Sequence, residues 1–392
     1  MNKYLILPII FIMLIQTEVF SQKNANISIR WENIATLKKS DGSNSIGVAG
    51  AINALDGQSL IIAGGANFPD KMPWEGGKKD YSDEIHILQK FENKYEWNRK
   101  FNAKLPFPIA YCGNTSTPRG VVYAGGENDN GLSKKTFLIN FFSQSDQIDI
   151  NELPDLPNAL TNIFLTSIGN KVYAIGGDGP VNSSQAFLCL DLDNLKNGWI
   201  KLADLPIALA NSAVVVQNGP NGQNIYVIGG RSKDPSGISK LNNTLLIYDF
   251  KAKSWTYGAA ISDGLSTLNF SAGTATSLSD HFILISGGDN GIIFNKIETY
   301  LSQIAQAKNP EEKEVLLAKK NDLVINHQGF DRKLLVYNTL SNEWFKNGDL
   351  PFMPHVTSTA TKWGENIILS SGEIKPGIRT PNIMLGKVVQ TN

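Results

Sequence analysis

Six apolar runs that end in glycine recur along this chain. Five of them end in a glycine pair, and the sixth keeps a single glycine. They lie at residues 60–65, 121–126, 172–177, 225–230, 282–288 and 367–372. A nearly fixed period of about 50 residues is typical of repeat architectures, in which each unit is one supersecondary structure. This period limits the fold more than any other feature of the sequence.

Each repeat unit also carries three further strand-like segments. A strand of small residues, often following Leu-Pro, precedes the apolar run, and a third strand such as 186–190 or 244–248 follows it. A strand with a tryptophan completes most units, at Trp97, Trp199, Trp255 and Trp344. Four short strands per unit, with glycines that can adopt positive φ after the second strand, are typical of a kelch-type propeller blade. The sequence therefore predicts an all-β fold, a six-bladed kelch-type β-propeller, because an unrelated β-sandwich would not give six phased copies.

The two ends of the chain complement each other. Residues 29–37 resemble the tryptophan-bearing fourth strand of a unit but have no unit before them, whereas the last unit stops after its third strand at 382–386. We therefore expect the N-terminal strand to complete blade six and to lock the ring.

We call the apolar runs that end in glycine the glycine marks. The longest interval between two of them contains an insertion. Ile297, Leu301 and Ile304 follow helical spacing, and the segment 309–312 has an N-cap asparagine, a proline at the first helical position and a glutamate at N3. This pattern predicts a helical hairpin from about 295 to 320, between the second and third strands of blade five. It could act as a structural cap on that blade or as a lid over a site.

The N-terminus has the composition of a secretory signal. A short basic region with Lys3 precedes an apolar run at 4–15, and cleavage after Ser21 would leave 22–392 as a single propeller domain. An uncleaved anchor is disfavoured because the run is shorter than the ~20 residues that span a bilayer. We expect residues 1–21 to be a signal peptide and the protein to be exported to the periplasm, with no membrane association after cleavage.

Composition excludes several other functions. The 36 basic and 36 acidic side chains cancel, so no net field attracts nucleic acid or anionic membranes. Cys112 and Cys189 stand in separate repeats within apolar strand-like runs, which favours free thiols over a disulfide. The four histidines are scattered over different blades without metal-ligand spacing, and no phosphate loop or nucleophile elbow is present. We therefore predict no metal and no cofactor.

Charged residues follow the glycine marks directly. In propellers the loops between second and third strands share a face with the loops that enter each first strand, and that face surrounds the channel mouth. The residues after the marks should therefore converge on one funnel, a plausible site for a polar ligand, although each could instead be a solvated loop charge. They are Asn67, Glu127, Asp178, Arg231, Asp289 and Glu373.

The loop that follows the sixth mark carries two charges of opposite sign. Glu373 and Arg379 flank a turn that Pro376 and Gly377 make rigid, so both side chains can face one small molecule. Arginine can bind a carboxylate with two parallel hydrogen bonds, and a glutamate beside a sugar can act as a general acid or base. The alternative is an ion pair within the loop that only shapes the turn.

This loop resembles a family signature. Residues 372–380 are similar to the Gly-Glu-x-Lys-Pro-Gly-x-Arg-Thr motif of the kelch-type sialic acid mutarotases, also called N-acetylneuraminate epimerases. Segments 47–50, 63–66 and 77–81, the Ala110-Tyr111 pair and the helical insertion also match. The resemblance covers the mature chain but in a different order, which implies a circularly permuted member. A closed ring tolerates permutation because its ends meet.

The resemblance implies interconversion of the α and β anomers of N-acetylneuraminate by acid- and base-assisted opening and reclosure of the sugar ring. Glu373 would accept the proton and Arg379 would hold the carboxylate of this sugar acid. Trp74 would pack on the sugar. Further substrate contacts would come from Lys375, Asn67, Arg231 and Tyr111.

Two other functions stay open at this point. A non-catalytic glycan-binding propeller could use the same funnel, and a mutarotase of another sugar could use the same chemistry. The sequence also leaves the oligomeric state open, a homodimer included.

Overall fold

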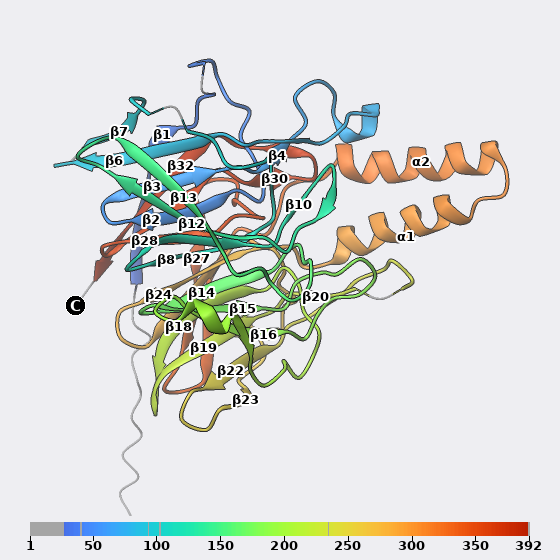
Figure 1. Cartoon of the computed structure of the whole chain (residues 1–392). Coiled ribbons are helices and arrows are strands. Elements are labelled where there is room, and N and C mark those ends of the chain that lie inside the picture. Colours follow the sequence, from blue (N-terminus) through green and yellow to red (C-terminus); the bar gives the residue numbers. More distant parts are fainter. Residues whose placement is uncertain (1–26, 40, 93, 102, 234, 391–392) are drawn as a thin grey trace, which may run out of the picture.

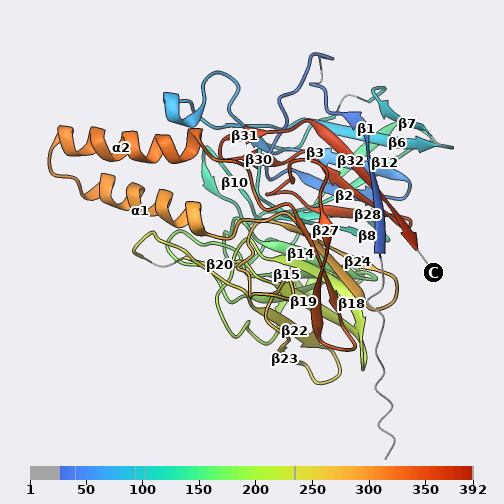
Figure 2. The ribbon, with the colours of Figure 1, turned by 180° about the vertical axis from the view of Figure 1, so that it is seen from behind.

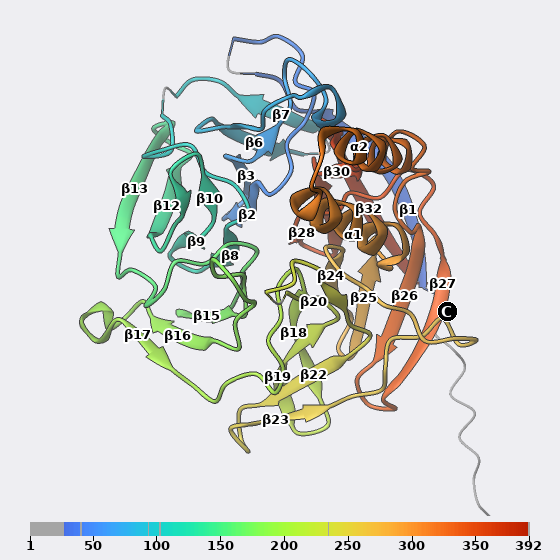
Figure 3. The same cartoon turned by 90° about the vertical axis from the view of Figure 1, so that its right-hand side faces the viewer.

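The structure is a computed structural model that describes residues 27–390 apart from 40, 93, 102 and 234. The predicted signal peptide at 1–21 lies outside the described residues. Six four-stranded antiparallel sheets stand around a central axis (Figure 3), so the predicted six-bladed β-propeller is confirmed.

Each blade runs from an inner first strand to an outer fourth strand. Blade one contains β2 (Ile52–Asp56), β3 (Ser59–Ala63), β6 (Ile85–Phe91) and β7 (Lys94–Asn98). Blade two contains β8 (Gly113–Thr117), β9 (Gly120–Ala124), β12 (Thr136–Phe142) and β13 (Gln147–Leu153). Blade three contains β14 (Phe164–Ile168), β15 (Lys171–Ile175), β16 (Phe187–Asp191) and β17 (Trp199–Lys201).

The second half of the chain repeats this order. Blade four contains β18 (Ala213–Gly219), β19 (Gly222–Ile228), β22 (Leu245–Asp249) and β23 (Ser254–Tyr257). Blade five contains β24 (Thr274–Leu278), β25 (Phe282–Ser286), β26 (Lys333–Asn338) and β27 (Glu343–Asp349). Blade six contains β28 (Ala360–Trp363), β29 (Asn366–Ser370), β32 (Asn382–Gln390) and β1 (Ile27–Thr36).

Blade six is built from both ends of the chain. β1 pairs antiparallel with β32 from Ile27 opposite Gln390 to Thr36 opposite Asn382, with a bulge at Ile34. The N-terminal strand is therefore the outer strand of the last blade, as the sequence predicted. The ring is closed by main-chain hydrogen bonds between segments at opposite ends of the described chain.

Packing between neighbouring blades forms the core. Each hydrophobic cluster combines the buried face of one blade with that of the next, as where Ile61 of blade one meets Val121 and Tyr123 of blade two. The outer-strand tryptophans reach back as well, since the indole N–H of Trp199 donates to Pro154 O at 2.9 Å and that of Trp255 to Ala203 O at 2.8 Å. The tryptophan repeat thus joins each of these fourth strands to the preceding blade.

The glycine marks connect each blade to the next. In the five paired marks both glycines have positive φ, and in blade six Ser371 takes the place of the first glycine with φ of 51°. The N–H of the second glycine donates to a carbonyl of the segment that enters the next blade in five of the blades. These bonds are Gly65 to Ile109, Gly126 to Leu160, Gly177 to Leu209, Gly230 to Phe270 and Gly372 to Val48.

Two helices interrupt blade five between β25 and β26. α1 (Ile292–Gln306) and α2 (Pro310–Ile325) form a hairpin that stands out from the loop face of the propeller (Figure 1). The predicted hairpin is confirmed, with bounds a few residues wider than expected. Asn309 caps α2, because its side chain accepts a hydrogen bond from the N–H of Glu312 at 2.8 Å.

Small features complete the loop face. Two-stranded ribbons follow four of the glycine marks: β4 (Ala66–Asn67) with β5 (Asp80–Tyr81), β10 (Glu127–Asn128) with β11 (Gly131–Leu132), β20 (Arg231–Ser232) with β21 (Lys240–Leu241), and β30 (Glu373–Lys375) with β31 (Ile378–Arg379). Short 3-10 helices lie at η1 (Pro73–Glu75) and η2 (Leu195–Asn197). Within the described residues, no helix has the length and apolarity needed to cross a bilayer. Cys112 and Cys189 are free thiols, as expected.

Candidate functional site

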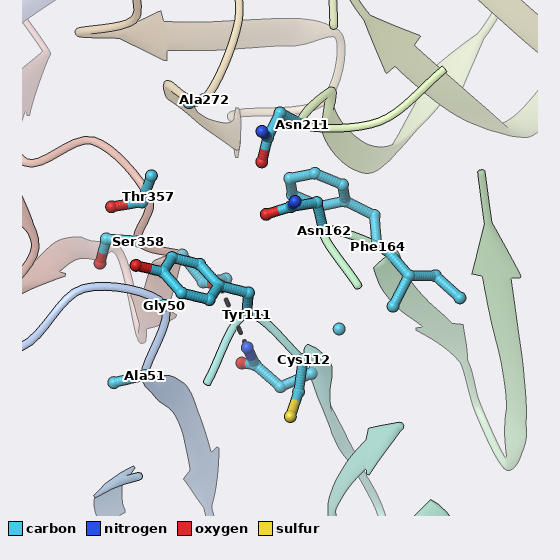
Figure 4. Close-up of a pocket in the computed structure, with 14 residues that line it drawn as sticks. Gly50, Ala51, Tyr111, Cys112, Asn162, Phe164, Asn211, Ala272, Thr357 and Ser358 are labelled. Carbon is cyan, nitrogen blue, oxygen red and sulfur yellow. Dashed lines mark hydrogen bonds between the residues drawn. The ribbon is translucent and has the colours of Figure 1, made fainter. Parts of the chain in front are cut away.

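A closed ring of backbone hydrogen bonds surrounds the central channel. One residue per blade, just before the first strand, donates its N–H to the carbonyl of the equivalent residue in the preceding blade, at 2.7 to 3.2 Å. All six have φ between 50° and 65°. We call them the backbone ring: Gly50, Tyr111, Asn162, Asn211, Ala272 and Thr357. Figure 4 shows the side chains of several of them gathered around the channel from different blades.

The residues after the glycine marks lie directly beside this ring. In each blade, the residue after the mark forms an antiparallel bridge with the residue that precedes the backbone-ring residue. The bridged residues after the marks are Ala66, Glu127, Asp178, Arg231, Asp289 and Glu373. Five of the six residues predicted to converge on the funnel therefore occupy equivalent places at the channel mouth. In blade one the place belongs to Ala66, and the side chain of Asn67 instead donates to Gly47 O at 3.1 Å.

Two ion pairs fix charges on one part of the mouth. Arg231 Nη2 lies 2.6 Å from Asp178 Oδ2, and both side chains are nearly buried. Lys79 Nζ lies 3.1 Å from Glu127 Oε1 and 4.7 Å from the ring centre of Tyr111. Burial acts to lower the pKa of Lys79, but Tyr111 and Glu127 raise it above its ordinary value. The raised pKa therefore favours the protonated, positively charged form of Lys79 beside the channel.

The Glu373 loop holds its carboxylate in one orientation. Glu373 stands opposite Arg379 in the β30–β31 ribbon, and its Oε1 accepts hydrogen bonds from Arg379 Nη1 at 3.1 Å and from the N–H of Gly377 at 2.7 Å. The other oxygen, Oε2, has no hydrogen-bond partner among the described residues. The ion pair within the loop is thus real, and it leaves one carboxylate oxygen available for a ligand.

Arg379 is almost inaccessible to solvent. Its side chain is 4% exposed, and its guanidinium carbon lies 4.9 Å from the ring centre of Phe68. Its Nε is buried and has no partner within the described part of the chain.

The turn of the same loop needs glycine. Gly377 has φ of 82°, and a Cβ there would stand 3.0 Å from Pro73 Cδ and 3.2 Å from the indole of Trp74. The β30–β31 ribbon therefore packs closely on η1. Figure 2 shows this ribbon beside the base of α2, and Asn321 of that helix donates to Trp74 O at 3.3 Å.

A cavity of about 320 Å³ lies between the helical hairpin and the channel mouth. Small-molecule sites in proteins commonly have ~300 to 1,000 Å³. Its walls include backbone-ring residues that also line the channel, so the two spaces adjoin. Its charged or titratable side chains are Arg231, Asp289, Lys320, His327 and Glu373, and its apolar wall includes Phe294, Ile297, Leu301, Val324 and Phe330. We call this space the hairpin cavity.

Hydrogen bonds connect the helical hairpin to the charged residues at the channel mouth. Glu298 of α1 accepts hydrogen bonds from Ser239 N–H at 2.7 Å and Ser239 Oγ at 2.9 Å. Ser239 Oγ also lies 3.4 Å from Arg231 Nη1. Ser239 therefore links α1, which supplies part of the apolar wall, to Arg231 in the same cavity.

Burial shifts the pKa values of three groups in this cavity. It raises the pKa of Asp289, while a hydrogen bond from Gly291 N–H acts in the opposite direction. It lowers the pKa of Lys320. Burial and the charge of Lys375 lower the pKa of His327, whereas Glu373 raises it. His327 Nδ1 accepts a hydrogen bond from Gly329 N–H at 3.0 Å, so the neutral imidazole carries its proton on Nε2.

The predicted site residues fall into two groups. Glu373 and Arg231 line the hairpin cavity, and Arg379 is bound to Glu373. Tyr111 lines the central channel, Lys375 lies close enough to act on His327, and Asn67 binds backbone.

Sequence reasoning missed some residues of the cavity and assigned no role to others. Lys320 and His327 were not predicted, and Asp289 was placed in the funnel without a role. The sequence signal for Asp289 is its place after a glycine mark, which gives its position but no chemical role. Within the described residues, no three His, Cys, Asp or Glu side chains gather as a metal site.

The fold and this site define a kelch-type propeller with a small-molecule cavity at its channel mouth. A family model described as N-acetylneuraminate epimerase matches residues 153–392, and the chain belongs to that family. An N-acetylneuraminate epimerase of Brucella melitensis biotype 1 is 30% identical over 238 residues, 60% of this chain and 58% of the relative.

Other relatives give a similar result. An N-acetylneuraminate epimerase of Yersinia enterocolitica serotype O:8 is 30% identical over 264 residues, 66% of this chain and 63% of the relative. A kelch domain-containing protein of Vibrio cholerae serotype O1 is 26% identical over 236 residues, 59% of this chain and 63% of the relative. The matches span about three fifths of the length of these relatives.

Proposed function

We propose that this protein interconverts the α and β anomers of N-acetylneuraminate. The observation that carries this proposal is the geometry of Glu373, a residue that lines the hairpin cavity. Its Oε1 accepts hydrogen bonds from Arg379 and Gly377, whereas its Oε2 has no hydrogen-bond partner among the described residues. Membership of the epimerase family supports the same substrate class. A positioned carboxylate of this kind suits proton transfer to and from a sugar hydroxyl.

The reaction requires opening and reclosure of a hemiketal. Glu373 accepts the proton of the anomeric hydroxyl, the bond from the anomeric carbon to the ring oxygen breaks, an acid gives the ring oxygen a proton, and a ketone and a ring hydroxyl form. The ring hydroxyl then attacks the other face of the ketone. Arg379 binds the substrate carboxylate, a role supported by its Nε, which has no hydrogen-bond partner among the described residues. Arg231 and the apolar wall of the hairpin cavity complete the binding surface.

The rate of anomer exchange tests this function. Fresh α-anomer is released by a sialidase, and its conversion is followed by NMR with and without the protein. We expect faster conversion with the wild-type chain and a loss of ~10² to 10⁴ in rate for Glu373→Gln. Glu365→Gln, which removes an exposed carboxylate, is the matched control and should keep the wild-type rate. Equal conversion with and without the wild-type protein would rule out the enzyme.

A glycan-binding propeller without catalysis is the second candidate. The ion pair between Glu373 and Arg379 favours it, because an ordered loop can recognise a sugar without moving a proton. Binding measured by calorimetry without any acceleration would establish this function. The same exchange assay with neutral and other acidic sugars decides whether the substrate must carry a carboxylate.

We propose that the chain is a circularly permuted member of its family. The family model matches only 153–392, and β1 lies beside β32 at the closure of the ring. Because Ile27 stands opposite Gln390, a two-residue hairpin turn can join them. A variant with this turn, opened between β17 and β18, should fold and exchange anomers. A variant that does not fold would contradict free exchange of the chain ends.

We also propose export to the periplasm with removal of residues 1–21, on the basis of the basic and apolar composition of that segment. The mass of the protein isolated from its host should correspond to a chain that begins at Gln22. An intact Met1 would refute cleavage.

A further inference from the structure

Asp289 differs from the other carboxylates at the channel mouth. Glu127 is paired with Lys79, Asp178 with Arg231, and Glu373 with Arg379. Asp289 has no cation within salt-bridge distance in the described part of the chain. Its Oδ1 accepts a hydrogen bond from Gly291 N–H at 2.7 Å, and this bond orients the side chain.

Asp289 and Glu373 border the same cavity from neighbouring blades. They occupy equivalent places after the marks of blades five and six, bridged to Ser271 and Val356. The next residues along the chain, Ala272 and Thr357, are joined directly in the backbone ring by a 2.8 Å hydrogen bond. Both residues line the hairpin cavity, so one sugar bound there can contact both.

We propose that Asp289 is a second catalytic residue, the acid that protonates the ring oxygen while Glu373 takes the proton of the anomeric hydroxyl. This inference rests on the proposed function and deepens it. Two carboxyl groups in different environments, one held by an arginine and one without a cation, suit opposite roles in proton transfer.

The proton transfers balance over the full reaction. On opening, the anomeric hydroxyl gives its proton to Glu373, the bond between the anomeric carbon and the ring oxygen breaks, and the ring oxygen receives the proton of Asp289. On reclosure, the ring hydroxyl attacks the ketone and returns its proton to Asp289. Glu373 then returns its proton to the new anomeric oxygen. Both groups end as they began.

The surroundings of Asp289 favour a protonated carboxyl. Burial raises its pKa. The other charged or titratable groups that face the cavity are Arg231 on β20, Lys320 on α2, His327 after α2 and Glu373 on β30. Arg231 is already bound to Asp178. His327 is a weaker candidate for the acid, since burial lowers its pKa and its Nδ1 is occupied by Gly329 N–H.

Asp289→Asn tests this role with little change in structure, because an asparagine oxygen can still accept from Gly291 N–H. We expect kcat for anomer exchange to fall ~10² to 10⁴-fold while KM changes less than about threefold. The wild-type rate should decline at high pH as Asp289 loses its proton, and this decline should vanish in Asp289→Asn. Asp289→Glu should recover part of the rate and show a decline at a shifted pH. Glu365→Gln is again the control.

The possible outcomes separate this inference from the function on which it rests. No acceleration by the wild-type protein would overturn both. A wild-type that accelerates exchange, with an Asp289→Asn that has the same kcat and pH profile, would overturn only the role of Asp289. Loss of the high-pH decline in His327→Gln would assign the acid to His327 instead. If Asp289→Asn melts early, Asp289→Glu decides, because an unshifted wild-type profile in that variant would exclude Asp289.

Discussion

The N–H of Val48 donates a 2.8 Å hydrogen bond to Ser371 Oγ, and this bond joins the last blade to the entry of the first. The hydroxyl can in turn donate to Val48 O at 3.0 Å or Thr380 O at 2.8 Å. Ser371 is fully buried and has φ of 51°, in the place that glycine takes in the other blades. At the sixth mark the last blade therefore joins the first, and the hydrogen bonds of the Ser371 hydroxyl offset the backbone strain of a positive φ at a residue other than glycine.

Ser371→Ala should destabilise the propeller. It keeps the positive φ but leaves the N–H of Val48 buried without its partner, which costs about 1 to 3 kcal/mol. Urea unfolding should show this loss in the free energy of unfolding. Ser371→Gly removes the same hydroxyl but relieves the backbone strain, so it should lose less. An alanine variant as stable as the wild type would contradict a closing role for this hydroxyl.

Arg379→Lys should impair activity although the charge is kept. A lysine cannot hold Glu373 Oε1, stack on Phe68 and offer a further donor at the position of Nε. We expect kcat/KM for anomer exchange to fall about tenfold or more. Phe68→Leu keeps the ion pair and removes only the cation–π contact, so its loss should be about two- to fivefold. Equal losses in the two variants would mean that the guanidinium matters only through Phe68.

Acid should weaken the fold through His355. This side chain is buried beside Phe352, and burial lowers its pKa to about 4, against the raising effect of hydrogen bonds to the backbone of Ser371 and Leu369. The unfolded chain binds this proton more tightly, so its contribution is complete above about pH 6.5 and is lost as the pH falls toward 4. The loss amounts to about 3 kcal/mol. Unfolding measured across this range should show a shallower slope for His355→Gln; an unchanged slope would assign the acid sensitivity elsewhere.

Removal of the helical hairpin should separate binding from folding. No side chain of α1 or α2 is fully buried, so replacing residues 292–325 with a short flexible linker removes little of the core and keeps Gly291. The hairpin cavity would lose Phe294, Ile297 and Val324 from its wall. We expect a folded propeller by circular dichroism with a raised KM. An unchanged KM would show that the hairpin is a cap on blade five and no part of the site.

The elements that the sequence predicted are those that depend on period and pattern. Blade number, closure by β1 and the Asn309 cap all follow from residues close in sequence or from a repeat. Asn67 shows the limit, because counting along the chain cannot tell that Ala66 occupies the bridge in blade one.

The pairing of charges could not be read in this way. Lys79 meets Glu127 and Arg231 meets Asp178 across about 50 residues of sequence, and the loops that bring them together differ between blades. The unpaired state of Asp289 is visible only once the other pairs are known. Distance in space, and not residue type, decides which carboxylate is neutralised.

The backbone ring has a consequence for how such a site can change. Its six members are a glycine, a tyrosine, two asparagines, an alanine and a threonine, yet each makes the same main-chain bond to its neighbour. Closure of the channel thus depends on peptide groups, and five of the six positions carry a side chain while making this bond. New ligand preferences can arise by substitution at these five positions without reopening the scaffold, whereas a Cβ at Gly50 would stand 2.4 Å from Tyr111 Cδ1.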